Sequence, residues 1–343
     1  MDTPAVEDIT GTGTHKDGDV LLQSAFWGQF KASFGWQSRR FTCDGRPVLV
    51  LVRPLAAGFS LAYVPHGPCL EGTSDPGKFL TGLGRGLSEH LPKGCFCIRF
   101  DLPDQASPEL ISNLEHTPGI VKAPVDIQPP DTVVLSLEAG EDEILEGMKS
   151  KTRYNIRLSG KKGVRIVEGG KDDLDDWYAL FEETGRRDRI ALHSRDYFET
   201  LFNLAGSFGE GAPALRLLFA EAEGERVAAV IVGRYRSSST YLYGASSGRY
   251  RNYMPAYGLQ WHAMTTEKQA GSRSYDLFGI PPADDPDHPM HGLYRFKTGF
   301  GGRILKRPGC WDLPLRPGVY RMYRGAEGVR NYYFKVIKKR TDG

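Results

Sequence analysis

The sequence lacks any apolar run long enough to cross a membrane. Its longest uninterrupted aliphatic stretch, Val48–Val52, is far shorter than the ~20 residues of a transmembrane helix. The opening residues, MDTPAVEDIT, contain neither the basic patch nor the apolar segment of a signal peptide. These absences exclude a membrane-spanning helix and lead us to expect a cytoplasmic protein.

Cysteine is scarce, and metal-ligand spacing is missing. Five cysteines in 343 residues are an odd and scattered set, which argues against a disulfide framework. No cysteine has a histidine partner in a recognisable motif, so a covalent cysteine intermediate is not indicated. The loop 284–291 is rich in Asp and His, but its ligand spacing is irregular and we predict no metal site there.

Net charge is small but unevenly distributed. The 44 Lys+Arg and 42 Asp+Glu give +2, yet residues 315–343 alone carry +6. A second basic segment lies in the middle of the chain, where Lys149, Arg153, Arg157 and Lys161 recur every four residues along a predicted helix. This stripe is typical either of a solvated helix face or of phosphate contact, so a nucleic-acid or nucleotide partner is one interpretation.

What the sequence does contain is a repeated order of elements. The first half is predicted to form a helix within 21–36, strands at 37–43, 47–54 and 59–64, a helix at 76–90 and a buried strand from Cys95. The second half is predicted to form helices in DLDDWYALFEETG and SRDYFETLFNLAG, strands at 215–222, 227–234 and 240–246, a helix from Pro255 and the strand SYDLFG. This repeat of mixed sheets resembles the acetyltransferase (GNAT-like) architecture. The usual pyrophosphate loop of those enzymes is missing from both halves, which disfavours acetyl-CoA.

Seven segments, in order along the chain, resemble the Fem family of non-ribosomal aminoacyltransferases. They are QSAFWGQFKASFGW (23–36), YVPHGP (63–68), SKTRYNIRLSGKKGV (150–164), YLYGASS (241–247), MPAYGLQWHAM (254–264), YDLFGIPP (275–282) and HGLYRFKTGFGG (291–302). The resemblance implies an α/β fold with two GNAT-like domains related by internal duplication. We expect residues 1–148 plus 315–343 to form the first domain and residues 149–314 the second, without the helical arm of some members.

The resemblance also implies a reaction. Fem enzymes move an amino acid, usually Gly, Ala or Ser, from aminoacyl-tRNA to the third stem-peptide residue of a peptidoglycan precursor, either lipid II or the soluble UDP-MurNAc-pentapeptide. No cofactor is implied beyond the aminoacyl-tRNA co-substrate. Lys297 is our leading catalytic candidate and Phe296 the second, because a fixed ammonium flanked by the Phe296 ring can stabilise the developing oxyanion or the leaving oxygen. Without the resemblance, Lys297 would be interpreted as a surface lysine at a strand end.

Other candidates concern substrate binding. The resemblance implies that Lys31, on the helix that carries Trp27, contacts the diphosphate or nucleotide part of the acceptor. In compact members an Arg four residues before a Tyr contacts the same ligand; here His193 takes that place before Tyr197, and Arg195 or Arg189 could supply the charge instead. Alternation along a strand predicts that Tyr241 and Tyr243 share one face, and could line a cleft between the domains with two further aromatic residues, Tyr63 and Tyr257. Asp276 is a weaker candidate for orienting the amine.

Several interpretations stay open at this point. The basic stripe at 149–161 is assigned to tRNA, and the carboxy-terminal tail to peripheral contact with the inner face of the plasma membrane, to tRNA or to solvent. We expect a monomer. The rival functions are another GNAT-fold N-acyltransferase with a different donor or amine acceptor, and a non-catalytic module that binds RNA or the precursor.

Overall fold

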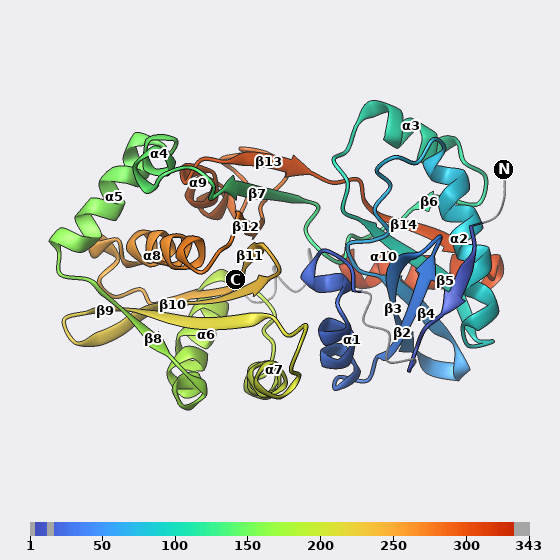
Figure 1. Ribbon diagram of the computed structural model, residues 1–343, viewed down its shortest axis with the longest axis horizontal. Coiled ribbons are helices and arrows are strands. Elements are labelled where there is room, and N and C mark those ends of the chain that lie inside the picture. Colours follow the sequence, from blue (N-terminus) through green and yellow to red (C-terminus); the bar gives the residue numbers. More distant parts are fainter. Residues whose placement is uncertain (1–3, 12–16, 333–343) are drawn as a thin grey trace. The chain divides into compact units, whose positions relative to one another are not determined.

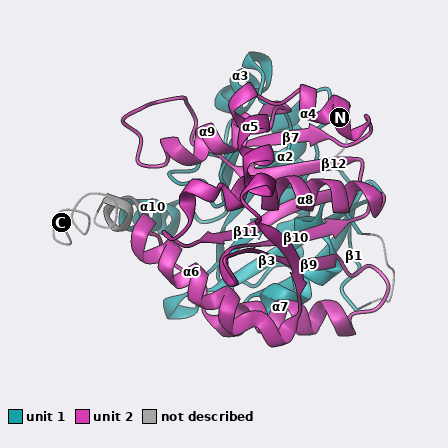
Figure 2. Ribbon diagram, turned by 90° about the vertical axis from the view of Figure 1, so that its left-hand side faces the viewer, with its two compact units in different colours: residues 1–130, 307–343 teal, residues 131–306 magenta. Residues whose placement is uncertain are grey.

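The computed structural model describes residues 4–11 and 17–332, with the side chains of the last helix placed up to Glu327. Figure 1 labels its helices and strands, and Figure 2 colours its two compact units. The first unit comprises residues 1–130 and 307–343, and the second comprises residues 131–306. Each unit has its own mixed sheet and its own core.

The first unit contains a seven-stranded sheet. In spatial order its strands are β1 (Val6–Asp8), β2 (Gln37–Cys43), β3 (Arg46–Pro54), β4 (Ser60–Val64), β5 (Cys95–Leu102), β14 (Gly309–Pro314) and β6 (Val121–Lys122). All neighbours are antiparallel except β4 and β5, which run parallel. The central strand β3 is apolar at every position from Val48 to Val52, and all five side chains are buried. A strand of this kind must be covered on both faces.

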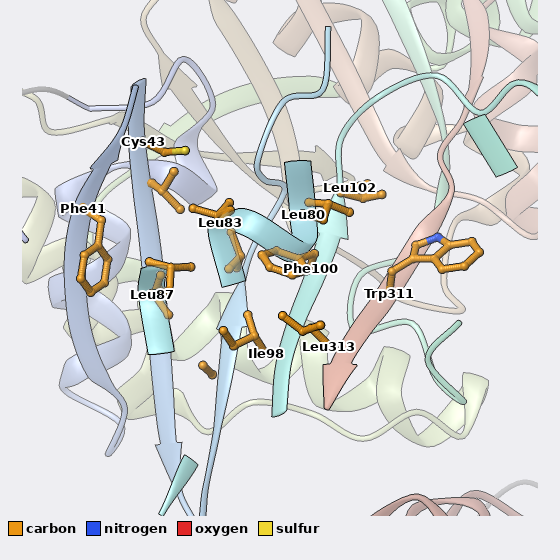
Figure 3. Packing of buried hydrophobic residues seen from close by; sticks show 14 of the residues in the cluster. Phe41, Cys43, Leu80, Leu83, Leu87, Ile98, Phe100, Leu102, Trp311 and Leu313 are labelled. Atoms are coloured by element: carbon orange, nitrogen blue, oxygen red, sulfur yellow. The ribbon is translucent and has the colours of Figure 1, made fainter. Parts of the chain in front are cut away.

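Helices provide that cover. They are α1 (Ala25–Ala32), α2 (Pro76–His90), α3 (Pro108–His116) and α10 (Pro317–Tyr332). Leucines of α2, Leu80, Leu83 and Leu87, recur at helical spacing and pack against Ile98 and Phe100 of β5 (Figure 3). The helix begins where Pro76 follows an Asp75 cap, whose carboxylate accepts from the Lys78 backbone N–H at 3.2 Å.

The second unit repeats this plan. Its strands, in spatial order, are β8 (Arg165–Gly169), β9 (Ala214–Ala222), β10 (Glu225–Tyr235), β11 (Ser238–Ser246), β12 (Ser274–Gly279), β7 (Asp131–Ser136) and β13 (Arg303–Lys306). Again one pair, β11 with β12, is parallel and the others are antiparallel. The parallel pair occupies the same place in both sheets, and the connection across it contains a helix in both. This correspondence indicates an internal duplication.

Helices cover both faces of the second sheet as well. They are α4 (Glu141–Glu146), α5 (Ser150–Lys161), α6 (Leu174–Asp188), α7 (Arg195–Ser207), α8 (Pro255–Gln269) and α9 (His291–Gly299). Residues of α4, α5, α8 and α9 belong to one apolar cluster on one face, whereas α6 and α7 pack on the other (Figure 1).

The division between the units differs from the one that we expected. The sequence placed boundaries after residues 148 and 314, and the structure divides the chain after residues 130 and 306. Strand pairing explains the difference: β7 pairs with β12 and β13 in the second sheet, while β14 pairs with β5 in the first. The sixth strand in each spatial order, β14 in the first sheet and β7 in the second, therefore comes directly after a point where the chain passes from one unit to the other.

Two local expectations also need correction. The four basic residues from Lys149 to Lys161 do not all lie on one helix, because α4 ends at Gly147 and Lys149 becomes the cap that precedes α5. Near the amino terminus, β1 adds an edge strand beside β2, which the predicted elements did not include. The basic tail from residue 333 onward lies outside the described residues.

Candidate active site

Lys297 is a buried helix residue, not a surface lysine at a strand end. It lies in the last turn of α9, and 6% of the residue is exposed. Its Nζ donates to the carbonyl oxygens of Gly279 at 2.9 Å and Phe278 at 3.3 Å, both on β12. The same ammonium lies 5.1 Å from the ring centroid of Tyr241 on β11. The amine is thus placed where the parallel pairing of β11 and β12 stops after Thr240 and Asp276.

The environment of Lys297 makes it titratable near neutral pH. Burial opposes the charged form and lowers the pKa of Lys297 to about 7, and the charge of Asp276 acts in the opposite direction. An amine with such a pKa can donate a hydrogen bond as the ammonium or accept a proton as the free base. Side chains with pKa values moved toward neutrality are typical of reacting sites.

The glycines after Lys297 form the turn that ends α9. Gly301 and Gly302 have φ values of +81° and +80°, a region that disfavours side chains. A Cβ on Gly301 would lie 2.6 Å from the Gly147 carbonyl oxygen, and a Cβ on Gly302 would lie 2.6 Å from that of Val134. The positive φ values and the close backbone packing within the unit therefore explain why both positions are glycine.

The prediction that Tyr241 and Tyr243 share a face is wrong. A β-bulge separates them: Tyr243 is opposite Ile231, whereas Tyr241 is opposite the next residue, Val232. Because consecutive residues of β10 point to opposite faces, the two tyrosines do so as well. Tyr241 packs in the cluster below α8, while Tyr243 lies 5.1 Å, centroid to centroid, from Phe198 of α7.

The Tyr241 side chain occupies the space beside Gly244 that a larger residue would need. A Cβ at this glycine would overlap the Tyr241 hydroxyl, so no larger residue fits without moving the ring. Burial raises the pKa of Tyr241 to about 12, and the phenol remains neutral over the physiological range.

Phe296 and Tyr257 form an aromatic wall beside the lysine. Their ring centroids are 4.9 Å apart in an edge-to-face arrangement, and Phe300 completes the group at 5.1 Å from Phe296. This packing orients the last turn of α9, which carries Lys297. It gives Phe296 a structural contact in addition to the role that we predicted for it.

His193 and Tyr197 lie together at the start of α7. Their rings stack at 3.9 Å with an interplanar angle of 7°, and the Tyr197 hydroxyl is 3.0 Å from that of Tyr243. Arg195 has two carboxylate partners, Asp175 at 2.5 Å and Glu199 at 2.7 Å. Since Arg195 is already paired, the exposed His193 is the better placed of these residues to meet an anion when it is protonated.

In the first unit, Lys31 lies against two indole rings. Its Nζ is 5.8 Å from the ring centroid of Trp27 and 5.9 Å from that of Trp36. Burial, followed by the positive charge of Arg53, lowers the pKa of Lys31. The Arg53 guanidinium also lies over Trp36, at 5.3 Å. Two cations around one half-buried indole form an anion-attracting surface, of which the sequence indicated only Lys31 and Trp27.

Tyr63 contacts a buried carboxylate that the sequence did not single out. Its hydroxyl donates to Asp101 Oδ2 at 2.7 Å, and its ring centroid is 6.2 Å from that of Trp36. Burial raises the pKa of Asp101 to about 6, although the Tyr63 hydrogen bond opposes this rise. Strand alternation in CFCIRFDL places Asp101 on the same face as Arg99, which is opposite Tyr63 of β4, but it could not have shown that the Tyr63 hydroxyl reaches Asp101.

The basic stripe begins at Lys149, the cap of α5, and continues along that helix, and its members differ in their contacts. Arg153 donates to the carbonyl oxygens of Met148 and of Glu146, the latter at 3.1 Å, and so caps the end of α4. Lys149, Arg157 and Lys161 are exposed. Tyr154, on the same face, is 62% exposed. No acidic residue interrupts α5, so its outer face is a cationic surface with one aromatic ring.

Other interpretations of the sequence find no support in the geometry. Within the described part of the chain, no three His, Cys, Asp or Glu side chains converge as metal ligands, and His291 instead pairs with Asp284 at 2.7 Å. The segment 244–248, GASSG, matches the Gly-x-Ser-x-Gly motif of serine nucleophiles. Its central Ser246 lies at the end of β11 with no α-helix directly after it, unlike a nucleophile elbow.

A hollow elsewhere in the second unit does not contain any predicted site residue. It has a volume of about 570 Å³ and is lined chiefly by α6 and the turn between β9 and β10. Its charges are mutually paired: Arg226 contacts Asp173 at 2.7 Å and Asp176 at 2.6 Å. Paired charges of this kind offer little to a ligand.

Comparison with known proteins establishes the family. The model of the FemAB family matches residues 112–222 and 216–328, which together span more than half of the chain. The chain belongs to the FemAB family. These matches confirm the family that the seven sequence segments indicated.

Individual FemAB relatives span nearly the whole length. The lipid II:glycine glycyltransferase of Staphylococcus epidermidis is 22% identical over 381 aligned positions, which cover 90% of this chain and 91% of that protein. The protein of the same name from Staphylococcus aureus USA300 is also 22% identical, with the same coverage. The crystal structure of FemX superposes with a TM-score of 0.76 at 20% identity, covering 91% of this chain and 96% of FemX. The fold is thus that of FemX, and the chain is an acyltransferase.

One finding bears on the membrane. Along the described residues, no helix combines the length and the apolar character that crossing a bilayer requires.

Proposed function

We propose that this protein transfers an aminoacyl group from aminoacyl-tRNA to the amine of the third stem-peptide residue of a peptidoglycan precursor. The observation that carries the proposal is the buried Lys297, whose amine is fixed by two backbone carbonyls and has a pKa near neutrality. Lipid II is the first acceptor to test and glycine the first amino acid, since the relatives are lipid II:glycine glycyltransferases. Alanine, serine and the soluble UDP-linked precursor are the next choices.

The reaction needs no covalent enzyme intermediate. The neutral acceptor amine attacks the ester carbonyl, the new C–N bond forms, and the C–O bond to the ribose breaks. The amine loses one proton and the departing ribose oxygen gains one. Lys297, as the ammonium, has three N–H donors, of which the carbonyls of Phe278 and Gly279 take two. We assign the third donor to the oxyanion or to the leaving oxygen, a role that is typically worth a factor of about 10²–10³ in rate.

The donor is proposed to contact the outer face of α5. Lys149, Arg157 and Lys161 supply positive charge, and the exposed Tyr154 offers a ring on which a base could stack. Acidic side chains are absent from this helix, so phosphates would meet no opposing charge there.

The acceptor is proposed to use the cations of the first unit. Lys31 and Arg53 around Trp36 suit the diphosphate of the precursor, since cations held beside an aromatic ring attract an anion in partly dry surroundings. In α10, Arg321 and Arg324 are exposed, and so is the apolar Met322 at 69%. This pattern supports peripheral contact with an anionic membrane. We therefore propose that the protein acts at the cytoplasmic face, and that it does so as a monomer.

A single experiment tests donor and acceptor together. The purified protein is incubated with charged tRNA and with lipid II in detergent or the soluble precursor, and product masses are read by mass spectrometry. We expect the acceptor mass to increase by one or more amino-acid residues, and the increase to vanish after RNase treatment. Lys297→Met should abolish it, while Lys306→Met, at an exposed position of the same unit, should not. Full transfer by Lys297→Met would refute the assigned role, and no transfer to either precursor would favour another amine acceptor or a binding module.

The role of α5 has a separate test. The double variant Arg157→Gln, Lys161→Gln should bind tRNA more weakly, and the slope of log affinity against log salt should fall by about one to two. Lys171→Gln, at an exposed position before α6, is the matched control. An unchanged slope in the double variant would remove α5 from the donor site.

A further inference from the structure

An irregular turn in β12 supplies the carbonyls that accept from Lys297. Regular pairing of this strand ends at Asp276, which is opposite Thr240 of β11 and Val134 of β7. Pairing with β7 resumes at Gly279, opposite Thr132. Between these points Phe278 has a φ of +58°, a left-handed conformation that a bulky residue rarely adopts. The chain therefore needs a local contact to stabilise this turn.

The Asp276 carboxylate provides that contact. Its Oδ1 accepts from the Phe278 backbone N–H at 2.7 Å and also from the Thr132 hydroxyl of β7. One oxygen thus ties the irregular turn to the neighbouring strand. With Phe278 fixed in this way, its carbonyl and that of Gly279 are both directed at Lys297 Nζ.

The groups around Lys297 come from several elements. Among the described residues, Asp276 of β12 is the charged residue that raises the pKa of Lys297. From β11, Tyr241 presents a ring whose phenol stays neutral, since burial raises its pKa to about 12. At the start of α5, Lys149 donates to Thr298, the neighbour of Lys297, at 3.5 Å. The nearby aromatic wall formed by α8 and α9 is uncharged.

We propose that Asp276, buttressed by Thr132, is a positioning residue for Lys297: it holds the Phe278–Gly279 carbonyls in place and supplies the negative charge that favours the ammonium. The inference rests on the proposed function in taking Lys297 as the ammonium that stabilises the oxyanion or the leaving oxygen. It differs from a role in proton abstraction, since Asp276 acts here through Lys297 and not on the substrate.

The substitution Asp276→Asn separates charge from geometry. An amide oxygen can still accept from Phe278 and Thr132, so the turn is retained while the charge is lost. The pKa of Lys297 is read by NMR from its ¹³Cε resonance in lysine-labelled protein, with the signal assigned by its absence in Lys297→Met. We expect Asp276→Asn to lower this pKa by about one unit, as loss of a neighbouring opposite charge should. The alkaline limb of the transfer rate should move down by the same amount.

Substitutions of Thr132, which donates to Asp276, test whether the geometry of the β12 turn matters. Thr132→Val removes the hydroxyl donor at similar volume, and Thr132→Ser restores it. We expect Thr132→Val to lower kcat several-fold with the KM for the acceptor unchanged, and Thr132→Ser to recover most of the rate. In Asp276→Ala, which loses both contacts, the Phe278 amide should exchange its hydrogen faster than in Asp276→Asn.

The outcomes distinguish this inference from the proposed function. An unchanged pKa of Lys297 in Asp276→Asn, or a kcat in Thr132→Val equal to that of the unaltered protein, would overturn the positioning role. The NMR titration and the hydrogen exchange need no turnover. If they behave as expected while no precursor is modified, the positioning holds and the proposed reaction fails. If Asp276→Asn does not fold, the Thr132 pair decides the question.

Discussion

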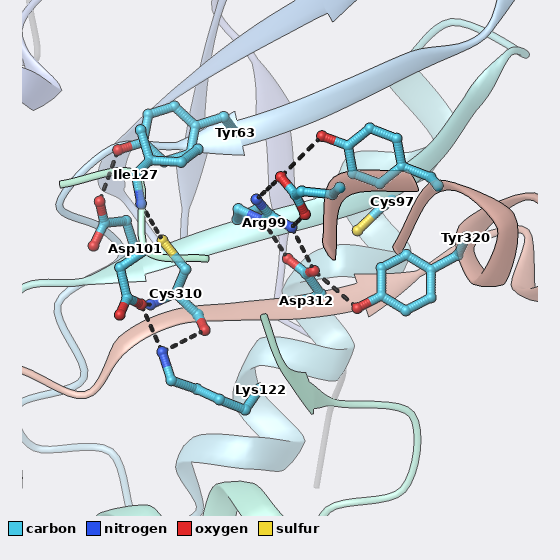
Figure 4. A network of polar contacts seen from close by, with 12 residues as sticks. Tyr63, Cys97, Arg99, Asp101, Lys122, Ile127, Cys310, Asp312 and Tyr320 are labelled. Atoms are coloured by element: carbon cyan, nitrogen blue, oxygen red, sulfur yellow. Dashed lines mark hydrogen bonds and ion pairs between the residues drawn. The ribbon is translucent and has the colours of Figure 1, made fainter. Parts of the chain in front are cut away.

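The two units bury cations in opposite ways. In the first unit Arg99, 1% exposed, meets two buried carboxylates, pairing with Asp312 at 2.7 and 2.9 Å and with Glu327 at 3.0 and 3.1 Å (Figure 4). Both interactions are bidentate, and the Tyr320 hydroxyl donates to Asp312 at 2.9 Å. In the second unit Lys297 has carbonyl oxygens and an aromatic ring as its immediate partners.

The difference separates a structural charge from a reactive one. Carboxylates raise the pKa of Arg99 further above its already high value, so it stays charged and its geometry is rigid. Lys297 has no such neutralising partner among the described contacts, and burial brings its pKa to about 7. Dipoles stabilise an ammonium less than carboxylates do, and they leave it able to change its protonation state.

The Arg99 network should give the largest effect on stability. Arg99→Met leaves Asp312 and Glu327 buried without their cation, so we expect the free energy of unfolding to fall by about 3–5 kcal/mol. Urea denaturation measures the change. As a matched control, Arg165→Met removes an exposed pair with Glu221 and should cost about 0–1 kcal/mol. Equal losses in both variants would contradict the structural role of the network.

Lys297→Met should raise the free energy of unfolding, whereas Arg99→Met should lower it. Because the native state has the lower pKa, the unfolded chain binds more protons between about pH 7 and 10, and stability rises with pH in that window. Replacing the lysine removes a cost that is largest below pH 7. We therefore expect thermal unfolding at pH 6 to show a gain on the order of 3 kcal/mol that shrinks toward pH 10. A loss at pH 6 would mean that Lys297 is well stabilised as a cation.

Asp101 extends the comparison to a buried acid. Its pKa is raised to about 6, so the native state binds more protons between about pH 4 and 6, and stability falls as pH rises through that range. Asp101→Asn should stabilise the protein by about 2 kcal/mol at pH 8 and by little at pH 4. Thermal unfolding over this range, with the exposed Asp172→Asn as control, would detect the change, and a gain independent of pH would argue against burial of the charge.

Substitution of Lys31 should give the smallest effect, and it should change only the binding of the acceptor. It is half-buried against indole rings and takes no part in the proposed bond-forming step. Lys31→Ala is expected to raise the KM for the acceptor about tenfold, about 1.4 kcal/mol, with kcat little changed. Steady-state kinetics measure both constants. A fall in kcat as large as that of Lys297→Met would move Lys31 into the reacting site.

Many elements were predictable from local pattern. The helix at Pro76–His90 has the same bounds in the structure as in the prediction, because a capping Asp, a first-position proline and leucines at helical spacing all agree. The strand at Gln37–Cys43 also matches. By contrast, the face of Tyr243 was mispredicted because a bulge depends on how β10 and β11 pair, and the break at Gly147 depends on packing around α4.

The sequence by itself determined the family, the two-domain mixed α/β plan and the identity of Lys297 as a candidate. These features depend on residue order and periodicity, which are local. Only the tertiary structure decided that Arg99 pairs with residues 213 and 228 positions away, that Asp101 meets Tyr63, and that Lys297 is buried against the carbonyls of β12. Burial and charge pairing arise where distant segments meet, and these two quantities set the protonation state of a side chain.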